Sequence, residues 1–182
     1  MNERRERGVD AEIAMKKNVL ITGKVGAGKS TLVREIVSEL GLKPAGYLTR
    51  GIPERGLKLR CEIISLTDGV VPEKGIMADR EIGGAYRVCN MGVNAGVLES
   101  VGAVALEKAV GTSPLIVMDE IGNMEAVSPR FQTAVIAALE SRTPVLGVIK
   151  LGAGPFVDRI KARSDIALIK ISNMNYDLVK HY

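Results

Sequence analysis

Short aliphatic runs alternate with amphipathic segments along most of the chain. The aliphatic runs are bounded by glycine, proline or charged residues, which is typical of strands buried on both faces. They occupy Val19–Thr22, Pro114–Asp119, Pro144–Lys150 and Ile166–Ile171. Helical spacing of apolar residues predicts helices over Ser30–Leu40, Val93–Val110, Pro129–Ser141 and Phe156–Arg163. Strands that alternate with helices indicate βαβ units on a largely parallel sheet.

The segment after the first helix has a different pattern. Ala45–Arg50 and Leu57–Leu66 read as two strands of an antiparallel hairpin. The loop between them is expected to hold Gly51, Pro53 and Gly56. Thr67–Gly84 is polar and irregular, so we expect turns and a surface loop there. Ala85–Asn90 could form a short further strand.

These elements predict one three-layer α/β domain over residues 17–182, with an antiparallel hairpin inserted into a largely parallel sheet. Residues 1–16 precede the first strand and are rich in charge of both signs, which favours a solvated, flexible arm. No repeat, low-complexity tract or linker divides the chain. A length of 182 residues is enough for one domain with a substantial core.

Composition excludes several classes of protein. The net charge is 25 − 21 = +4, basic residues are scattered and aromatics are only 3%, so we expect no nucleic-acid partner. The longest aliphatic runs are far shorter than the roughly 20 residues of a membrane span. The N-terminus lacks the apolar stretch of a signal peptide, so the expected location is the cytoplasm, and we expect a monomer.

The chain has too few cysteines and histidines for the common zinc sites and histidine-dependent catalytic triads. Cys61 and Cys89 cannot build a disulfide framework or a CxxC zinc site, and we expect two buried, reduced thiols. The single histidine, His181, is next to the C-terminus. This count excludes a histidine-based triad and multi-histidine metal sites.

The strongest chemical signal is the segment GKVGAGKS, from Gly23 to Ser30, which matches the phosphate-binding pattern GxxxxGK[ST]. A buried strand precedes it and an amphipathic helix follows, as that pattern requires. Gly23, Gly26 and Gly28 allow successive backbone N–H groups to point at an anion, and the helix adds its positive dipole end. A glycine-rich turn without phosphate chemistry would leave the Lys29–Ser30 pair unexplained.

Two acidic residues end the second aliphatic run, in LIVMDE. Lys29 is expected to reach the β- and γ-phosphates, and Ser30 to ligate Mg²⁺. Asp119 is the candidate for holding the same Mg²⁺ through a water, and Glu120 for activating or positioning the water that attacks the γ-phosphate. A plain acidic turn at a strand end is the alternative interpretation. The catalytic candidates are therefore Glu120 and Lys29, and the metal candidates are Ser30 and Asp119.

Other nucleotide-handling signatures are missing. The chain has no NKxD motif, because Met124 follows Asn123, and it has no protein-kinase signature. No motif therefore specifies the base. Positive charge beyond Lys29 would have to come from an arginine near a strand or helix end, although each of these is expected to be a surface residue. The arginines in question are Arg50, Arg130, Arg159 and Arg163.

The chain resembles the small P-loop nucleoside-triphosphatases first described from thermophiles, a family with a human cancer-related homologue. The resemblance rests on GKVGAGKSTL at 23–32, GYLTR at 46–50, DEIGNME at 119–125 and PVLGVIK at 144–150. It extends from Lys17 to the C-terminus. Three features depart from the family pattern: Asn123 replaces a lysine, Asn175-Tyr176-Asp177 replaces Asn-Arg-Asp, and about sixteen residues precede the first strand.

The resemblance implies a RecA-like P-loop core and Mg²⁺-dependent hydrolysis of several nucleoside triphosphates, ATP and GTP among them, to diphosphates. It also implies kinship with nucleotide kinases and a nucleotide site built from two segments. The first comprises Gly23, Lys24, Val25, Gly26, Ala27, Gly28, Lys29, Ser30 and Thr31, and the second comprises Leu115, Ile116, Val117, Met118, Asp119, Glu120, Ile121 and Gly122.

Three functions remain open from the sequence. The first is a nucleoside-triphosphatase of relaxed base specificity. The second is a nucleotide or small-molecule kinase, for which Thr67–Gly84 could close over an acceptor. The third is a nucleotide-dependent switch that binds a partner protein.

Overall fold

The structure is a computed structural model that describes residues 16–53, 59–152, 154–172 and 175–176. The charged arm predicted over residues 1–16 therefore lies outside the described residues, except for Lys16, and so does His181. The P-loop, the acidic strand end and most of the predicted hairpin are described.

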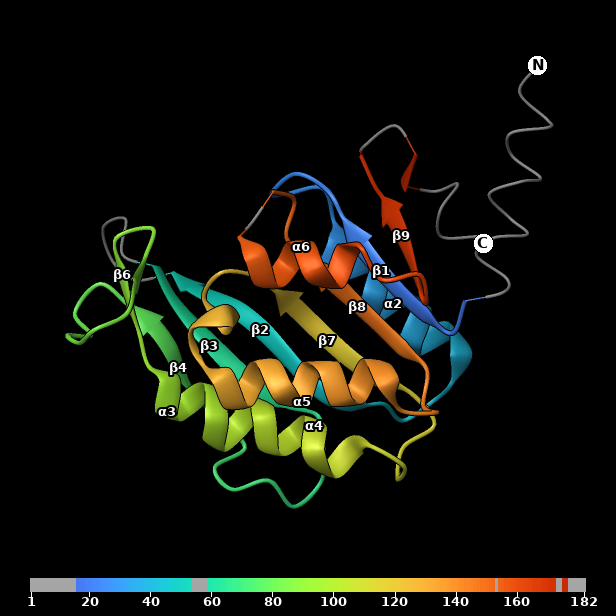
Figure 1. Ribbon diagram of the computed structural model, residues 1–182, viewed down its shortest axis with the longest axis horizontal. Coiled ribbons are helices and arrows are strands. Elements are labelled where there is room, and N and C mark those ends of the chain that lie inside the picture. Colours follow the sequence, from blue (N-terminus) through green and yellow to red (C-terminus); the bar gives the residue numbers. More distant parts are fainter. Residues whose placement is uncertain (1–15, 54–58, 153, 173–174, 177–182) are drawn as a thin grey trace.

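Nine strands of the described residues form one mixed sheet, in the order β5-β6-β4-β3-β2-β7-β8-β1-β9 (Figure 1). The strands are β1 (Asn18–Thr22), β2 (Ala45–Pro53), β3 (Leu59–Ser65), β4 (Lys74–Asp79), β5 (Arg87–Val88), β6 (Met91–Val93), β7 (Ile116–Ile121), β8 (Val145–Ile149) and β9 (Ile166–Lys170). β2, β7, β8, β1 and β9 are parallel to their neighbours in this block. The remaining pairs, from β2–β3 outward, are antiparallel.

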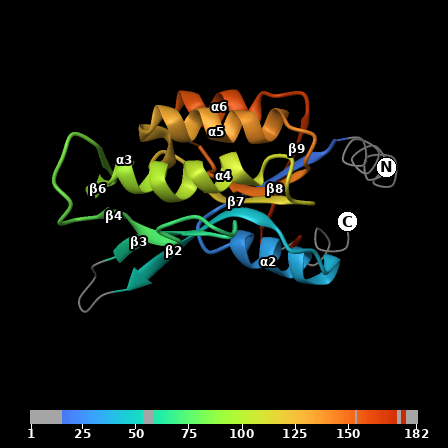
Figure 2. The ribbon, with the colours of Figure 1, turned by 90° about the horizontal axis from the view of Figure 1, so that it is seen from below.

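Helices cover both faces of the sheet. They are α2 (Lys29–Leu40), α3 (Ala95–Val97), the π-helical segment η1 (Leu98–Ala103), α4 (Val104–Ala109), the 3₁₀ turn η2 (Glu125–Val127), α5 (Pro129–Glu140) and α6 (Pro155–Lys161). α2 lies on one face, and α4, α5 and α6 lie on the other (Figure 2). The predicted three-layer α/β architecture is confirmed. None of these helices is long and apolar enough to cross a membrane.

Alternate residues of the central strands feed two separate apolar cores. In β1, Leu20 packs into the core under α5, while Ile21 packs with Leu32 and Val33 of α2. Each of these four side chains is at most 1% exposed. A strand buried on both faces needs a continuous apolar sequence, which explains why the aliphatic runs predicted β1, β7 and β8 correctly. The burial predicted for Ile166–Ile171 is wrong, because β9 is an edge strand in which Leu168 is 42% exposed.

One long helical segment runs from Ala95 to Ala109, within the predicted range of 93–110, but its centre is π-helical. Asn94 caps its start by accepting a hydrogen bond from the Val97 backbone N–H. At Gly102 the backbone passes very close to its neighbours, because a Cβ there would lie 2.4 Å from Phe131 Cε2 and 2.7 Å from Ile63 Cδ1. Only glycine fits between α5 and β3 at this point.

The polar loop expected over Thr67–Gly84 is wrong in its middle, whereas residues 67–73 and 80–84 are irregular as expected. Lys74–Asp79 forms β4, which pairs antiparallel with β3 and, through Ala78 and Asp79, with β6. Its apolar signal is weak, with a lysine and a glycine at the start, so pairing with β3 rather than local propensity determines the strand. The antiparallel part of the sheet is therefore larger than one hairpin.

The predicted hairpin is confirmed, and its first strand is longer than expected. β2 continues through Gly51 and Pro53, two residues expected in the loop, and pairs with β3 along that length. The rest of that loop lies outside the described residues. The extra length carries β2 beyond its last pair with β7, Leu48 with Asp119.

The burial predicted for both cysteines is wrong, although both thiols are free. Cys61 is half-buried in β3, whereas Cys89 is exposed. Cys89 and Asn90 form a two-residue turn between β5 and β6, and both have positive φ values, 51° and 64°. Such a turn is typical of tight hairpins, and its side chains point to solvent.

Candidate functional site

The phosphate-binding loop connects β1 to α2 at the carboxyl edge of the parallel strands. Gly26 and Gly28 have φ values of 79° and 84°, and Gly28 is the N-cap of α2 without a side-chain cap. The loop therefore leaves the first N–H groups of α2 available to an anion, beside the positive end of the helix dipole.

The side chains of the loop differ in exposure. Ala27 is buried, Lys24, Val25 and Thr31 are exposed, and Lys29 is half-buried. Lys29 Nζ donates a 3.0 Å hydrogen bond to the Lys24 backbone carbonyl, so its ammonium group lies across the loop. A phosphate bound in the loop would offer this ammonium a stronger, charged acceptor.

Ser30 and Asp119 meet across the edge of the sheet. Ser30 Oγ donates a 2.8 Å hydrogen bond to Asp119 Oδ1, although 89 positions separate the two residues. β8 lies between β1 and β7, and the three strands run parallel, so the ends of β1 and β7 lie on the same edge. The fold thus brings the two predicted metal ligands together.

Burial dominates the electrostatics of Asp119. Desolvation, with a smaller contribution from the negative charge of Glu120, raises the pKa of this carboxyl to about 6. The hydrogen bond from Ser30 and the positive charges of Arg34 and Lys29 oppose that rise. The site would therefore favour a cation beside Asp119, because a cation stabilises the charged form.

Glu120 lies at an irregularity in β7. Asp119 pairs with Val148 and Ile121 with Ile149, so Glu120 is an extra residue with no partner in β8. A bulge of this kind turns a side chain away from the regular alternation of a strand. Glu120 remains half-buried, whereas Ile121 returns to the core under α5.

The donor atoms at this edge suit Mg²⁺. Octahedral Mg²⁺ ligands at about 2.1 Å from the ion lie roughly 3 Å from each other, which is close to the spacing of Ser30 Oγ and Asp119 Oδ1. The described residues contain no group of three Asp, Glu, His or Cys side chains able to hold a metal.

Half of the second predicted segment lies away from this edge. Leu115, Ile116, Val117 and Met118 are at most 6% exposed and belong to the two cores. They hold β7 in the sheet, and Leu115 and Val117 belong to the same buried cluster as Ala27 of the P-loop. Asp119, Glu120, Ile121 and Gly122 follow at the carboxyl end, where the loop after the strand begins.

The positions that depart from the family pattern both have defined contacts. Asn123 Oδ1 accepts a 3.1 Å hydrogen bond from the Gly154 backbone N–H and so connects the end of β7 to the start of α6. The Tyr176 ring lies against Gly28, where a Cβ would be 2.6 Å from its Cε2 atom. An aromatic ring thus lies against the P-loop at the position where the family pattern has an arginine.

The four candidate arginines all have partners. Arg50 pairs with Glu62, Arg130 with Glu107 and Arg163 with Asp165. Arg159 lies over the Phe156 ring, with 5.8 Å between its guanidinium carbon and the ring centre. These contacts agree with the surface role expected for them.

Sequence reasoning missed two buried polar residues close to Glu120. Tyr47 is fully buried, and its hydroxyl donates a 3.2 Å hydrogen bond to the Glu120 backbone carbonyl. Glu125 is 5% exposed, and burial raises its pKa to about 7. Both lie in the family motifs GYLTR and DEIGNME, but only the burial seen in the structure distinguishes them from surface polar residues.

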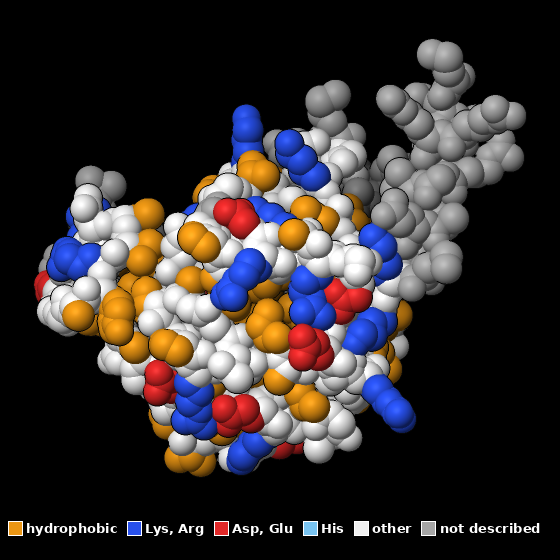
Figure 3. Space-filling view, viewed as in Figure 1, with side chains coloured by type: hydrophobic (Ala, Val, Ile, Leu, Met, Phe, Trp, Pro, Cys, Tyr) orange, Lys and Arg blue, Asp and Glu red, His pale blue; other side chains and the backbone are white. Residues whose placement is uncertain are grey.

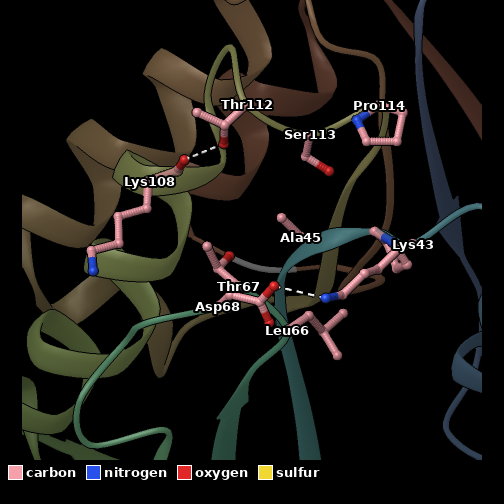
Figure 4. Close-up of a pocket in the computed structure, with 10 residues that line it drawn as sticks. Lys43, Ala45, Leu66, Thr67, Asp68, Lys108, Thr112, Ser113 and Pro114 are labelled. Atoms are coloured by element: carbon pink, nitrogen blue, oxygen red, sulfur yellow. Dashed lines mark hydrogen bonds and ion pairs between the residues drawn. The ribbon is translucent and has the colours of Figure 1, made fainter.

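A separate pocket of about 410 Å³ lies at the opposite edge of the sheet, near the start of β2 (Figure 4). Its cations are already engaged. Lys43 Nζ lies 2.7 Å from Asp68 Oδ2, and Lys108 Nζ donates a hydrogen bond to the Gly69 carbonyl. The pocket is therefore distinct from the phosphate-binding edge, and Asp68 already pairs with one of its two lysines.

Charges of both signs are mixed on the face that carries α5 and α6 (Figure 3). Ion pairs such as Arg130–Glu107 and Arg163–Glu140 contribute to this pattern. A positive stripe, as expected for nucleic-acid binding, is not visible on this face. The absence of a nucleic-acid partner stays a prediction.

A P-loop between β1 and α2, with an Asp–Glu pair ending a parallel strand two positions away, defines a P-loop nucleotide-binding enzyme of the α/β class. A sequence model of the NTPase family matches residues 18–182. The chain belongs to this family of nucleoside-triphosphatases.

Individual relatives agree with that assignment. The chain is 37% identical over 157 residues to the nucleoside-triphosphatase THEP1 of Thermotoga sp. (strain RQ2), covering 86% of this chain and 87% of that one. It is 34% identical over 168 residues to THEP1 of Thermofilum pendens, covering 90% and 91%.

Two solved structures share the fold. The crystal structure of THEP1 from Aquifex aeolicus superposes with a TM-score of 0.76 at 29% identity, covering 90% of this chain and 95% of that one. The solution structure of a human cancer-related nucleoside triphosphatase gives 0.72 at 24% identity, covering 90% and 93%. The predicted P-loop fold class is thereby confirmed.

Proposed function

We propose that this protein is a Mg²⁺-dependent nucleoside-triphosphatase that hydrolyses ATP, GTP and other nucleoside triphosphates to diphosphates and inorganic phosphate. The observation that carries the proposal is the contact between Ser30 Oγ and Asp119 Oδ1, with Glu120 following at the bulge of β7. It supports a phosphate cradle, a pair of metal ligands and a further carboxylate at one edge of the sheet.

Each residue has one role in the proposed reaction. The P-loop backbone binds the phosphates, and Lys29 stabilises the charge that develops on the γ-phosphoryl oxygens. Ser30 and Asp119 would hold Mg²⁺, which when bound neutralises phosphate charge. Glu120 orients a water molecule and accepts its proton as the water oxygen bonds to the γ-phosphorus. The bond from that phosphorus to the β–γ bridging oxygen breaks, and the diphosphate leaves.

Relaxed base specificity is part of the proposal. It is supported by the absence of an NKxD motif from the sequence, together with the backbone character of the phosphate site. Backbone N–H groups recognise phosphate oxygens, which are identical in all four nucleoside triphosphates. We also propose a monomer in the cytoplasm, and the free thiols of Cys61 and Cys89 suit a reducing compartment.

Product analysis with each of the four nucleoside triphosphates tests the proposal. The wild-type protein should release diphosphate and inorganic phosphate in equal amounts, and EDTA should stop the reaction. Lys29→Ala should abolish nucleotide binding or turnover, whereas Glu120→Gln should bind a non-hydrolysable ATP analogue normally but lose hydrolysis. Glu140→Gln, an exposed change at the end of α5, is the matched control. Normal phosphate release by Glu120→Gln would refute the assigned base.

The two other functions are separate outcomes of the same experiment. With γ-labelled ATP and a panel of nucleosides, nucleotides and small alcohols, a labelled acceptor would indicate a kinase. Because β4 holds Lys74–Asp79 in the sheet, the long loop that could have closed over an acceptor is divided into two shorter segments. Hydrogen exchange that differs between the triphosphate analogue and the diphosphate, with negligible turnover, would indicate a switch.

A further inference from the structure

The backbone that follows Asp119 is held from β2 by a buried tyrosine. Tyr47 Oη donates its hydrogen bond to the carbonyl of Glu120, at 3.2 Å. The Tyr47 ring is fully buried and packs edge-on against Phe131 of α5, with 5.2 Å between ring centres. The hydroxyl therefore cannot swing away, and it fixes the peptide unit immediately after the Glu120 side chain.

A buried carboxylate holds the same segment two residues further on. Glu125 Oε2 lies so close to Gly122 that a Cβ on this glycine would be 3.1 Å away. Hydrogen bonding from the backbone of Gly122 and of Glu125 itself partly offsets the cost of burying this acid. The Gly122 carbonyl in turn accepts a 3.2 Å hydrogen bond from the Ala126 N–H, which closes the turn.

Between these two contacts, the strand itself holds the chain. The Lys150 backbone N–H donates a 3.0 Å hydrogen bond to the Ile121 carbonyl. Three consecutive carbonyls therefore accept hydrogen bonds. That of Glu120 accepts from a side chain, that of Ile121 from the residue after β8, and that of Gly122 from the following turn. The backbone that carries Glu120 therefore has little conformational freedom.

Burying an acid at this place costs stability. Glu125 is 5% exposed and, among the described residues, it has no ion pair within 4 Å. An apolar residue would fill the same space at lower cost. Polar groups that weaken the fold in this way are typical of functional sites.

We propose that Tyr47 and Glu125 are positioning residues that fix the backbone around Glu120 and so direct its carboxylate at the attacking water. The inference rests on the proposed hydrolysis, in which Glu120 acts on that water. Neither residue needs to touch the substrate.

Tyr47→Phe is the first test, with Thr67→Val as its matched control. The control also removes one partly buried hydroxyl. At the opposite edge of the sheet, this hydroxyl accepts a hydrogen bond from the Gly46 N–H and donates one to the Ala105 carbonyl. We expect Tyr47→Phe to lower kcat about 10-fold with KM unchanged, because a small misplacement of a catalytic group slows the chemical step. Thr67→Val should leave both constants near the wild-type values. Equal losses of kcat in the two variants would overturn the inference.

Glu125 is tested by a pair of substitutions of similar size. Glu125→Gln keeps a carbonyl acceptor toward Gly122 and should retain kcat within about threefold, whereas Glu125→Met removes the acceptor and should lower kcat about 10-fold. Thermal unfolding and binding of a non-hydrolysable analogue confirm that each variant is folded. Equal activity of Glu125→Met and the wild type would contradict the assignment.

A double-mutant cycle asks whether Tyr47 acts through Glu120. In the Glu120→Gln background, Tyr47→Phe should cause no further loss of the residual single-turnover rate. A second, equal loss would show that Tyr47 acts independently and would overturn the inference. The proposed function fails separately, if the wild-type protein releases no phosphate or if Glu120→Gln is fully active.

Discussion

Ser30 Oγ donates a hydrogen bond to Asp119 Oδ1 over 2.8 Å, so the first turn of α2 is fastened to the end of β7. The contact spans β1 and β8 and needs the register of three parallel strands to be correct. Two oxygen ligands are therefore pre-arranged by the sheet, and neither depends on a flexible loop. This preorganisation is what the proposed metal site requires.

Ser30→Ala should weaken Mg²⁺ binding more than it weakens folding. The substitution removes one oxygen ligand and also the hydrogen bond that orients Asp119, and such losses reduce metal affinity by roughly 10- to 100-fold. The measurement is the Mg²⁺ concentration at half-maximal phosphate release. Ser38→Ala, at an exposed position in the last turn of α2, is the control. An unchanged Mg²⁺ requirement in Ser30→Ala would exclude Ser30 as a ligand.

Gly28→Ala should disrupt the phosphate cradle. Its φ of 84° is unfavourable for any residue with a Cβ, and that Cβ would be 2.6 Å from the Tyr176 ring. A strain of about 1 to 2 kcal/mol corresponds to a loss of nucleotide affinity of about 10-fold, measured by titration with a non-hydrolysable analogue.

Gly41→Ala is a matched control for that experiment. Gly41 caps the other end of α2, also with positive φ (61°), but a Cβ there would meet nothing within 4 Å. This variant should lose stability and keep nucleotide affinity. Equal affinity losses in the two variants would mean that strain in α2, rather than the cradle, controls binding.

The parts of the candidate site that could be predicted from the sequence are those formed by consecutive residues. The P-loop and LIVMDE are local patterns in which residue type and spacing together specify the geometry, so Gly28, Ser30 and Asp119 could all be predicted. The central strands could be predicted for a similar reason. Burial on both faces forces their sequence to be uniformly apolar.

Features determined by contacts between distant segments could not be predicted. β4 becomes a strand because β3 offers a free edge, although its own sequence begins with Lys74 and Gly75. Glu125 looks like any surface glutamate until α5 and β2 enclose it. The depth at which the sheet buries Leu115–Met118 likewise depends on strands that are distant in the sequence.

Gly102→Ala should destabilise the fold without changing the site directly. The added methyl group would overlap with Phe131 and Ile63, and overpacking of this kind costs about 1 to 3 kcal/mol. The free energy of unfolding in urea measures the effect. Gly83→Ala is the control, because a Cβ at Gly83 would meet nothing within 4 Å and its φ is not positive. Equal stability of the two variants would show that η1 can shift away from α5.

Glu125 should make stability depend on pH in a defined direction. Desolvation is the main cause that raises its pKa from 4.5 to about 7, and the charge of Glu120 adds to it. Between these values the folded protein holds a proton that the unfolded chain releases. The contribution of Glu125 to stability is therefore greatest below about pH 4.5 and falls as the pH rises through about 7.

Glu125→Gln cannot ionise and should lack this dependence. We expect the free energy of unfolding of the wild type, relative to that of Glu125→Gln, to fall by at most about 3 kcal/mol between pH 4.5 and pH 8. Urea unfolding at half-unit pH steps measures the difference. Glu73→Gln, which removes an exposed carboxyl before β4, controls for the change in net charge. Parallel curves for the wild type and Glu125→Gln would show that the folded state does not hold that proton, because the carboxyl is then ionised at the same pH in both states.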